Sequence, residues 1–382
     1  MQRKRLVLMT MLILAFLLIC STAAQAELEL DAEGAILMEA TTGKVIYEQD
    51  PDKPWKPASV TKVMTLLLAL EAIDQGKTSL DDMVLASEYA CGYGGSQLYL
   101  QPGEEFTMHE MLLGIAVGSG NDASVAVAEH LYGSHEAFVK EMNNKAKELG
   151  LKNTSFKNAH GLDDDDHYTS ARDMAIISRH AVLNYPEILD YTGVKFHVFR
   201  EEPLLELYNT NKMLWWFEGT DGLKTGFTSA AKRNLSSTVE RDNLRLLAVV
   251  LGVEQKSGHF KESMKLYQYG FAQYQFNKVI PGGEEVARLE VAKGSVDDVA
   301  VITPKDIGYI SKKGEEADPQ IEYHLDTKLT APIKKGDVVG EVVITQDGEE
   351  MCREELIAAY HVEKASLWRQ IYIVSRKVMS VF

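Results

Sequence analysis

The sequence has few positively charged residues for its length. Its 382 residues include 40 lysines and arginines against 56 aspartates and glutamates, a formal net charge of −16. A protein that binds nucleic acid needs clustered basic residues to release counterions from the phosphates, so this deficit argues against a nucleic-acid partner. Proline is also scarce, with 10 residues, and no internal repeat is present. Disordered, collagen-like and solenoid architectures are therefore excluded, and the 45% of hydrophobic residues predict ordinary globular domains.

Cysteine is nearly absent. The chain has three, and Cys20 lies in a segment that we expect to be removed, which leaves Cys91 and Cys352 far apart in the sequence. Two distant cysteines do not make a disulfide framework, and no cysteine or histidine cluster has the spacing of a zinc site. We expect neither a metal nor a cofactor.

The first 26 residues have the pattern of a secretory signal peptide. Basic Arg3-Lys4-Arg5 precedes the apolar run from Leu6 to Ile19, and Ala24-Gln25-Ala26 forms a small-x-small cleavage site. The alternative is an uncleaved anchor, but the apolar run is shorter than the ~20 residues that a bilayer span needs. Lipidation at Cys20 is disfavoured by the bulky Ile19 before it. The pattern predicts an exported protein.

The other end of the chain predicts attachment to a membrane. In residues 365–382, from Ala365 to Phe382, apolar side chains recur at helical intervals, three basic residues lie opposite them, and acidic residues are absent. An amphipathic helix of this kind suits the anionic surface of a bilayer, here the outer face of the cytoplasmic membrane. A helix docked on the protein's own core is the alternative.

Between these ends, residues 27–276 predict an α+β domain. A hairpin is expected around residues 35–47, an apolar helix after Ser59, and a strand at residues 244–251. Further helices are expected at Met108–Val117 and at residues 123–131, 134–149, 171–183 and 261–273. Strands near both ends with helices between them imply an antiparallel sheet flanked by a helical block.

Residues 277–363 predict a small all-β domain. Short alternating runs, such as Ala287-Arg288-Leu289-Glu290-Val291 and residues 321–325, are separated by turns. Residues 329–333 and 338–344, joined by the turn at 334–337, are expected to pair as a hairpin. We expect this domain to act in spacing or binding.

The first motif with chemical potential is Ser59-Val60-Thr61-Lys62. Positions i and i+3 share one face of a helix, so Lys62 can reach Ser59. Burial favours the neutral form of a lysine, which can then serve as a general base for a serine nucleophile. A helix N-terminus also offers N–H groups to a developing oxyanion.

Two further motifs support the first. Ser119-Gly120-Asn121, between two apolar helices, offers a second hydroxyl and an amide. Lys224-Thr225-Gly226, followed by Phe227, has the pattern of a strand edge beside a cleft, where lysine and threonine can bind a carboxylate. Each string is common alone, but three in this order indicate acyl-transfer chemistry.

With these motifs the sequence resembles the serine-type D-Ala-D-Ala carboxypeptidases, the low-molecular-mass penicillin-binding proteins. The stretch from Val117 to Ala123 shares the resemblance, as do His160-Gly161-Leu162 and Ser170-Ala171-Arg172-Asp173. It extends over nearly the whole chain, including the trailing β domain and the terminal helix. The fold it implies is the transpeptidase fold of penicillin-binding proteins and β-lactamases.

The resemblance also implies a reaction, a substrate and the roles of eight residues. The substrate is a peptidoglycan stem peptide ending in D-Ala-D-Ala, from which the terminal D-Ala is released through an acyl-enzyme, and β-lactams form a stable adduct at the same serine. The implied roles are nucleophile for Ser59, general base for Lys62, proton relay for Ser119 with Lys224, substrate binding for Asn121, Thr225 and Gly226, and backbone oxyanion binding for Ser59 with Phe227. Some relatives carry histidine at the position of Phe227.

Two alternatives remain at this point. A class A β-lactamase needs a glutamate that activates the deacylating water. The nearest candidate, Glu187-Ile188-Leu189-Asp190, matches imperfectly. A non-catalytic wall-binding scaffold is disfavoured because all three motifs are intact. Four consecutive acidic residues, Asp163–Asp166, are interpreted as a solvated loop.

Overall fold

The computed structural model describes residues 28–315, 318–366 and 368–369. The predicted signal peptide and nearly all of the predicted terminal helix therefore lie outside the described residues. Within the described parts of the chain, we find no helix with the length and apolarity that crossing a bilayer requires.

The N-terminal part of the fold is built on a five-stranded antiparallel sheet with the order β2-β1-β9-β8-β7. The first two strands form the expected hairpin, and the other three follow one another near the end of this part, which confirms the α+β class. The strands are β1 (Gly34–Glu39), β2 (Val45–Gln49), β7 (Thr220–Thr228), β8 (Lys232–Arg241) and β9 (Leu244–Val253).

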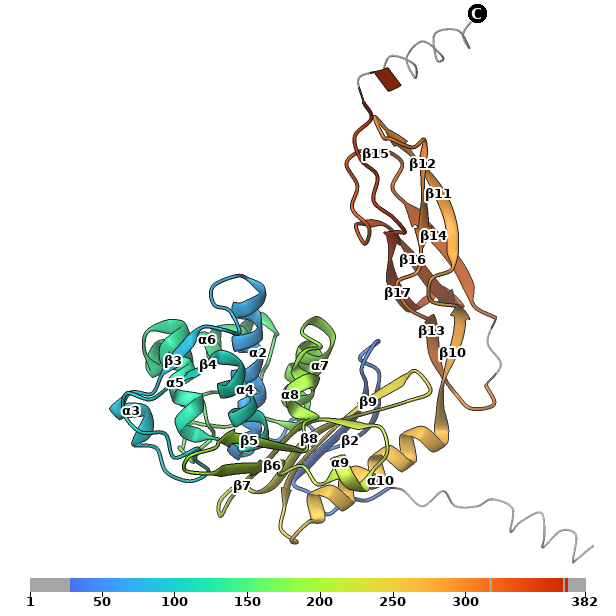
Figure 1. Cartoon of the computed structure of the whole chain (residues 1–382). Coiled ribbons are helices and arrows are strands. Elements are labelled where there is room, and N and C mark those ends of the chain that lie inside the picture. The colour runs from blue at the N-terminus through green and yellow to red at the C-terminus, as the bar shows by residue number, and fades with distance from the viewer. Residues whose placement is uncertain (1–27, 316–317, 367, 370–382) are drawn as a thin grey trace, which may run out of the picture. The chain divides into compact units, whose positions relative to one another are not determined.

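Helices cover both faces of this sheet (Figure 1). The helical block lies on one face, and α10 lies on the other. The block comprises η1 (Ala58–Thr61), α2 (Lys62–Asp74), α3 (Glu88–Cys91), α4 (Met108–Val117), α5 (Asn121–Tyr132), α6 (His135–Glu148), α7 (Ala171–Asn184) and α8 (Ile188–Thr192). The opposite face carries α10 (Gly258–Gln273). Small additional elements are β3 (Met83–Leu85), β4 (Glu105–Thr107), β5 (Phe196–Arg200), β6 (Leu205–Tyr208) and α9 (Met213–Trp216).

Burial on both faces explains why the central strands are apolar at nearly every position. In β1, Ile36 and Met38 join the core beneath the helical block. Leu37 faces the other way, and a Cβ added to Gly270 of α10 would lie 2.8 Å from its Cδ2 atom. Helix α2 is covered on all sides, with residues 62–70 buried. The apolar sequence of this helix therefore follows from its central position.

The β-rich part begins at Tyr274 and contains two sheets. One pairs β10 with β13, and the other has the order β14-β16-β17-β12-β11-β15. The strands are β10 (Tyr274–Ile280), β11 (Glu285–Ala292), β12 (Asp298–Ile302), β13 (Ile307–Lys312), β14 (Gln320–Leu325), β15 (Leu329–Thr330), β16 (Val338–Gln346) and β17 (Glu349–Ala358). Their buried faces form a separate core that includes Val299, Val342 and Leu356.

The predicted hairpin of residues 329–333 with 338–344 is wrong. The first of these segments forms β15, which pairs in parallel with β11, whereas β16 pairs with β14 and β17. Pro332 has no N–H group to donate to a neighbouring strand, and it ends β15 after Thr330. The side chains of Ile321 and Tyr323, on the edge strand β14, are exposed.

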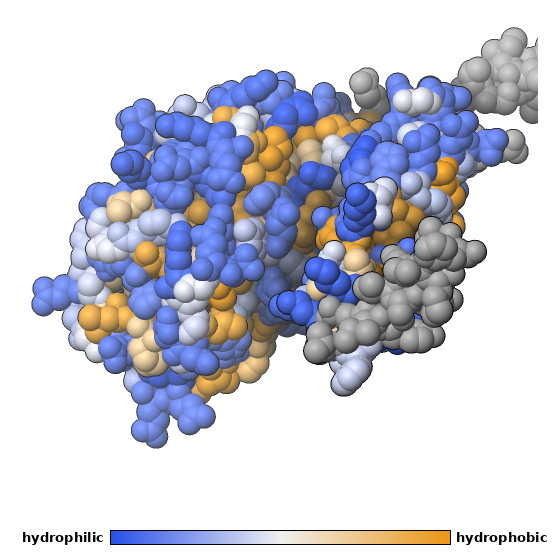
Figure 2. All heavy atoms as spheres, turned by 90° about the horizontal axis from the view of Figure 1, so that it is seen from above, coloured by the Kyte–Doolittle hydropathy of each residue, from blue (hydrophilic) through white to orange (hydrophobic). Residues whose placement is uncertain are grey.

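The surface is mainly polar on the face drawn in Figure 2, where hydrophobic residues form separate patches among hydrophilic ones. This agrees with a chain in which 25% of the residues are charged.

Candidate active site

Ser59 lies on the short helical turn η1, which leads directly into α2. The turn is tightly constrained, because Ala58 has a φ of 49° and its carbonyl oxygen accepts a 2.8 Å hydrogen bond from Thr61 Oγ1. A Cβ on Gly161 would lie 1.9 Å from that same oxygen, so only glycine fits beside it. The backbone around the candidate nucleophile is thus fixed by its neighbours.

Lys62 is completely buried and reaches three oxygen atoms. Its Nζ atom lies 3.1 Å from Ser59 Oγ, 2.7 Å from Asn121 Oδ1 and 2.7 Å from the carbonyl oxygen of His160. Burial, together with the positive charge of Lys224, holds the pKa of Lys62 well below its usual value, and Asp122 opposes this shift. A neutral amine donates two hydrogens, which suffice for Asn121 and His160. Its lone pair is then directed at the hydroxyl of Ser59, as a general base requires.

The Ser119-Gly120-Asn121 motif joins α4 to α5. Ser119 is buried and has a φ of 62°, and Asn121 is the first residue of α5. The Nδ2 atom of Asn121 donates to the carbonyl oxygen of Gly94 at 2.7 Å, and its Oδ1 atom accepts from Lys62. The amide is therefore held in one orientation, and its second Nδ2 hydrogen remains for a substrate carbonyl.

The Lys224-Thr225-Gly226 motif lies on β7, the edge strand of the sheet. Strand β7 pairs with β8 on one side, and its other side approaches η1. A Cβ on Gly226 would lie 2.7 Å from the carbonyl oxygen of Pro57 and 3.0 Å from the Ser59 nitrogen. Glycine at this position lets β7 come close to the backbone of Ser59.

The side chains of this strand differ sharply in exposure. Lys224 is 1% exposed, and burial lowers its pKa to about 7. Thr225 Oγ1 lies 2.6 Å from Thr210 Oγ1. Phe227 is 59% exposed and contacts the guanidinium group of Arg233 at 4.8 Å from the ring centroid. The structure thus places Lys62 in contact with both Ser59 and Asn121, and it brings the backbone of Gly226 against the same turn.

Sequence reasoning missed three supporting residues. Asp122 is buried and accepts from the backbone nitrogens of Leu98 and Leu100. Asn234 donates to the carbonyl oxygens of Lys56 and Pro57, at 2.9 and 2.8 Å. His167 contacts Thr61 Oγ1 at 2.9 Å. Asp122 directly follows the Ser119-Gly120-Asn121 motif, but its partners, like those of Asn234, lie far away along the chain.

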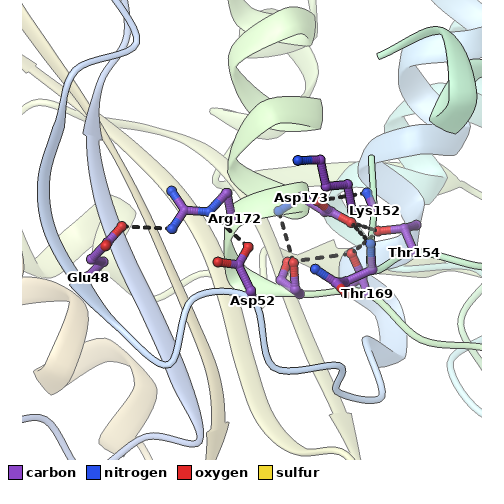
Figure 3. A network of polar contacts seen from close by, with 9 residues as sticks. Glu48, Asp52, Lys152, Thr154, Thr169, Arg172 and Asp173 are labelled. Atoms are coloured by element: carbon purple, nitrogen blue, oxygen red, sulfur yellow. Dashed lines mark hydrogen bonds and ion pairs between the residues drawn. The ribbon is translucent and has the colours of Figure 1, made fainter. Parts of the chain in front are cut away.

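The Ser170–Asp173 stretch acts as a scaffold at the start of α7 (Figure 3). The Asp173 carboxylate accepts from the nitrogen of Asn153 at 2.6 Å and from Thr154 Oγ1 at 2.8 Å. Arg172 lies between Glu48 and Asp52 and forms ion pairs with both, at 2.8 and 2.9 Å. These contacts connect α7 with β2 and with the loop after α6.

The other candidates lie outside this group of contacts. Asp164, Asp165 and Asp166 are exposed, in agreement with a solvated loop. Glu187 and Asp190, the candidates for a β-lactamase glutamate, are exposed as well. Among the described residues, no group of three or more histidine, cysteine or acidic side chains is arranged to hold a metal ion.

Comparison with known proteins gives concordant results. The sequence pattern of the D-alanyl-D-alanine carboxypeptidase family matches residues 20–255, and that of the penicillin-binding protein 5 C-terminal domain matches residues 274–364. The D-alanyl-D-alanine carboxypeptidase DacF of Bacillus subtilis is 42% identical over 343 residues, which cover 89% of this chain and 88% of DacF.

Solved structures confirm the fold of a penicillin-binding protein. Penicillin-binding protein 5 from Haemophilus influenzae is similar with a TM-score of 0.68 and 35% identity, over 89% of this chain and 99% of its own. Penicillin-binding protein D2 from Listeria monocytogenes, in its ampicillin-bound form, has a TM-score of 0.59 and 32% identity, over 64% of this chain and 99% of its own. By sequence pattern, relatives and fold, this chain belongs to the D-alanyl-D-alanine carboxypeptidase family.

Proposed function

We propose that this chain removes the terminal D-Ala from peptidoglycan stem peptides, with Ser59 as the nucleophile. The observation that carries the proposal is the contact of the buried Lys62 Nζ atom with Ser59 Oγ at 3.1 Å. Ser59 Oγ attacks the carbonyl carbon of the bond between the two D-alanines, and Lys62 accepts the hydroxyl proton. The negative charge on the carbonyl oxygen is stabilised by the N–H groups of Ser59 and Phe227.

The leaving amine must then be protonated. Lys224, with a pKa of about 7, can supply a proton near neutral pH, and Ser119 relays it. The C–N bond breaks, D-Ala leaves, and the acyl group remains on Ser59. Asn121 holds the amide that precedes the acyl group, and Thr225 binds the terminal carboxylate of the substrate. Water then attacks the ester, which releases the shortened peptide and restores the Ser59 hydroxyl.

The same cycle accounts for β-lactam binding. The β-lactam carbonyl acylates the serine, and the amine released by ring opening stays attached to the acyl group. The ampicillin-bound structure of the Listeria relative supports this part of the proposal. A β-lactamase would require a base for rapid deacylation, and the exposed positions of Glu187 and Asp190 do not favour that function.

The test is a D-Ala release assay on a pentapeptide ending in D-Ala-D-Ala. Wild-type chain should release one D-Ala for each peptide, and Ser59→Ala should abolish release. Ser229 is exposed in the turn after β7, and the variant Ser229→Ala is a control for serine replacement. Absence of release by the wild-type chain, or equal release by Ser59→Ala, would contradict the proposal.

We further propose that residues 1–26 are removed on export and that residues 27–276 form the catalytic domain. Residues 277–363 would form the β-rich domain, and residues 364–382 an anchor on the outer face of the cytoplasmic membrane. The basic and apolar pattern of the last segment supports this location. A chain that ends at Glu363 should leave the membrane fraction and keep its D-Ala release activity. Retention of the shortened chain on membranes would refute the anchor.

A further inference from the structure

A cavity of about 340 Å³ lies beside the turn that follows β7. Its lining includes two aromatic residues, two small apolar ones and two of opposite charge, namely Trp55, Tyr168, Pro54, Ala230, Lys56 and Asp165. Aromatic walls with a few polar groups are typical of a site for a small ligand. The proposed catalytic cycle uses none of these side chains, so the cavity has no role in the reaction as described so far.

The proposed position of the substrate on β7 gives the direction of the peptide. Thr225 binds its terminal carboxylate, and the N–H group of Phe227 binds the oxygen of the reacting carbonyl. The peptide therefore runs antiparallel to β7, and its N-terminal part continues past Phe227 towards the end of the strand at Thr228. Ala230, in the turn after this end, lines the cavity. The cavity thus lies on the N-terminal side of the substrate.

The length of the peptide indicates which part of the substrate reaches the cavity. Three residues of chain lead from Phe227 to Ala230, and they span at most about 10 Å. A pentapeptide has three residues before D-Ala-D-Ala, which also span about 10 Å when extended. The group at the cavity is therefore the one that carries the peptide. In peptidoglycan this group is a sugar of the glycan strand.

The two aromatic residues are held in place by their own contacts. Trp55 pairs with Thr169 through two backbone hydrogen bonds, at 2.7 and 2.9 Å, and its Nε1 atom donates to the carbonyl oxygen of Ala231 at 2.8 Å. Tyr168 pairs with Ser155 in the same way, at 2.9 and 3.0 Å. Both side chains are partly exposed. Fixed aromatic rings of this kind can pack against the C–H face of a pyranose at a low cost in conformational entropy.

The two charged residues supply polar groups at the same cavity. The Nζ atom of Lys56 donates to the carbonyl oxygen of Asp164 at 3.3 Å and lies 3.7 Å from Asp165 Oδ1. An ammonium group has three hydrogens, so a third remains for a ligand. Asp165 is fully exposed, and its carboxylate can accept from a hydroxyl group. An N-acetylated sugar offers both a carbonyl acceptor and hydroxyl donors.

We propose that this cavity binds an N-acetylated sugar ring of the glycan strand that carries the stem peptide. The proposal rests on the proposed function. The C–H face of the ring packs against Trp55 and Tyr168, which removes apolar surface from water. Lys56 donates to the acetamido carbonyl, and a sugar hydroxyl donates to Asp165. A peptide without a sugar makes none of these contacts, so the chain prefers substrate that is attached to glycan.

The test uses the mature full-length chain and two substrates with the same pentapeptide. One peptide is Nα-acetylated, the other is joined to the disaccharide of N-acetylglucosamine and N-acetylmuramic acid, and D-Ala release gives kcat/KM for each. We expect the disaccharide to raise kcat/KM at least fivefold. Tyr168→Leu and Trp55→Leu should bring the ratio of the two values close to one. Trp216→Leu is the matched control, because Trp216 is 54% exposed on α9, and it should keep the wild-type ratio.

The outcomes separate the sugar site from the proposed function. The acetylated peptide reports on folding, since each variant should release D-Ala from it at the wild-type rate. Equal kcat/KM for the two substrates in the wild-type chain, or a ratio that neither Tyr168→Leu nor Trp55→Leu changes, would overturn the sugar site and leave the proposed function intact. Absence of D-Ala release from both substrates would overturn the proposed function, and the sugar site with it.

Discussion

Gly226 of β7 lies directly against the backbone of Ser59, where an added Cβ would be 3.0 Å from the Ser59 nitrogen and 2.7 Å from the carbonyl oxygen of Pro57. The edge strand and the nucleophile turn can therefore approach each other only because this residue has no side chain. This contact determines the distance between the two N–H groups that we assign to the oxyanion hole.

The first prediction concerns this contact. Gly226→Ala should push β7 away from η1 and lower kcat/KM for D-Ala release by about 100-fold, the usual effect of a misplacement of ~1 Å. Gly92→Ala is the matched control, since its Cβ would meet nothing closer than 3.4 Å. Steady-state kinetics with both variants check this. Similar kinetics for Gly226→Ala and wild type would show that the close approach is not needed.

A second prediction concerns the pH dependence of kcat/KM. Lys62 must be neutral to accept a proton, so the rate should rise as pH increases through its lowered pKa. Lys224 must be protonated to act as an acid, so the rate should fall above its pKa of about 7. Lys224→Arg keeps the positive charge at all accessible pH values and should move the descending limb to higher pH. A descending limb unchanged in Lys224→Arg would assign it to another group.

A third prediction concerns His167 and stability. Its Nδ1 atom accepts from the backbone nitrogen of Lys157, and its Nε2 atom donates to Thr61 Oγ1. Burial lowers its pKa to about 4, and Asp164 partly opposes the shift. Because the folded-state pKa lies below the unfolded value of ~6.5, the stabilisation is complete above ~6.5 and is lost as pH falls towards 4.

Replacement of His167 should remove its part of this loss. We expect His167→Gln to reduce the difference in unfolding free energy between pH 7 and pH 4 by about 2–3 kcal/mol, as measured by urea unfolding. His180→Gln, a partly buried histidine on α7, serves as the comparison and should have a smaller effect. An unchanged difference in His167→Gln would show that its protonation is not coupled to folding.

A fourth prediction separates two neighbouring residues of α7. Asp173 is 2% exposed and accepts from several groups, so Asp173→Ala leaves buried donors unpaired and should cost about 2–4 kcal/mol. Arg172 forms ion pairs at the surface, so Arg172→Ala should cost less than about 1 kcal/mol. Chemical unfolding of both variants measures this difference. Equal losses would contradict the scaffold role assigned to Asp173.

Local pattern was enough to predict several parts of the structure. Ser59 and Lys62 are in contact because three-residue spacing at a helix start brings two side chains to one face. The bounds of Met108–Val117 agree with α4, where Thr107 caps the helix through a reciprocal contact with Glu110. Signals of this kind are carried by residues close in sequence.

Contacts between distant segments could not be predicted in this way. The bonds from Lys62 to Asn121 and to the His160 carbonyl depend on how α5 and a separate loop pack against α2. The parallel pairing of β15 with β11 likewise depends on tertiary packing, which alternation of side chains does not encode. The roles of the eight site residues remain predictions.

The most direct test of the central claim is mass spectrometry of the mature chain after reaction with benzylpenicillin. We predict one covalent adduct with the mass of the intact antibiotic, located on the peptide that contains Ser59 and absent from Ser59→Ala. An adduct on another residue, or one that persists in Ser59→Ala, would contradict the assignment of Ser59 as the nucleophile.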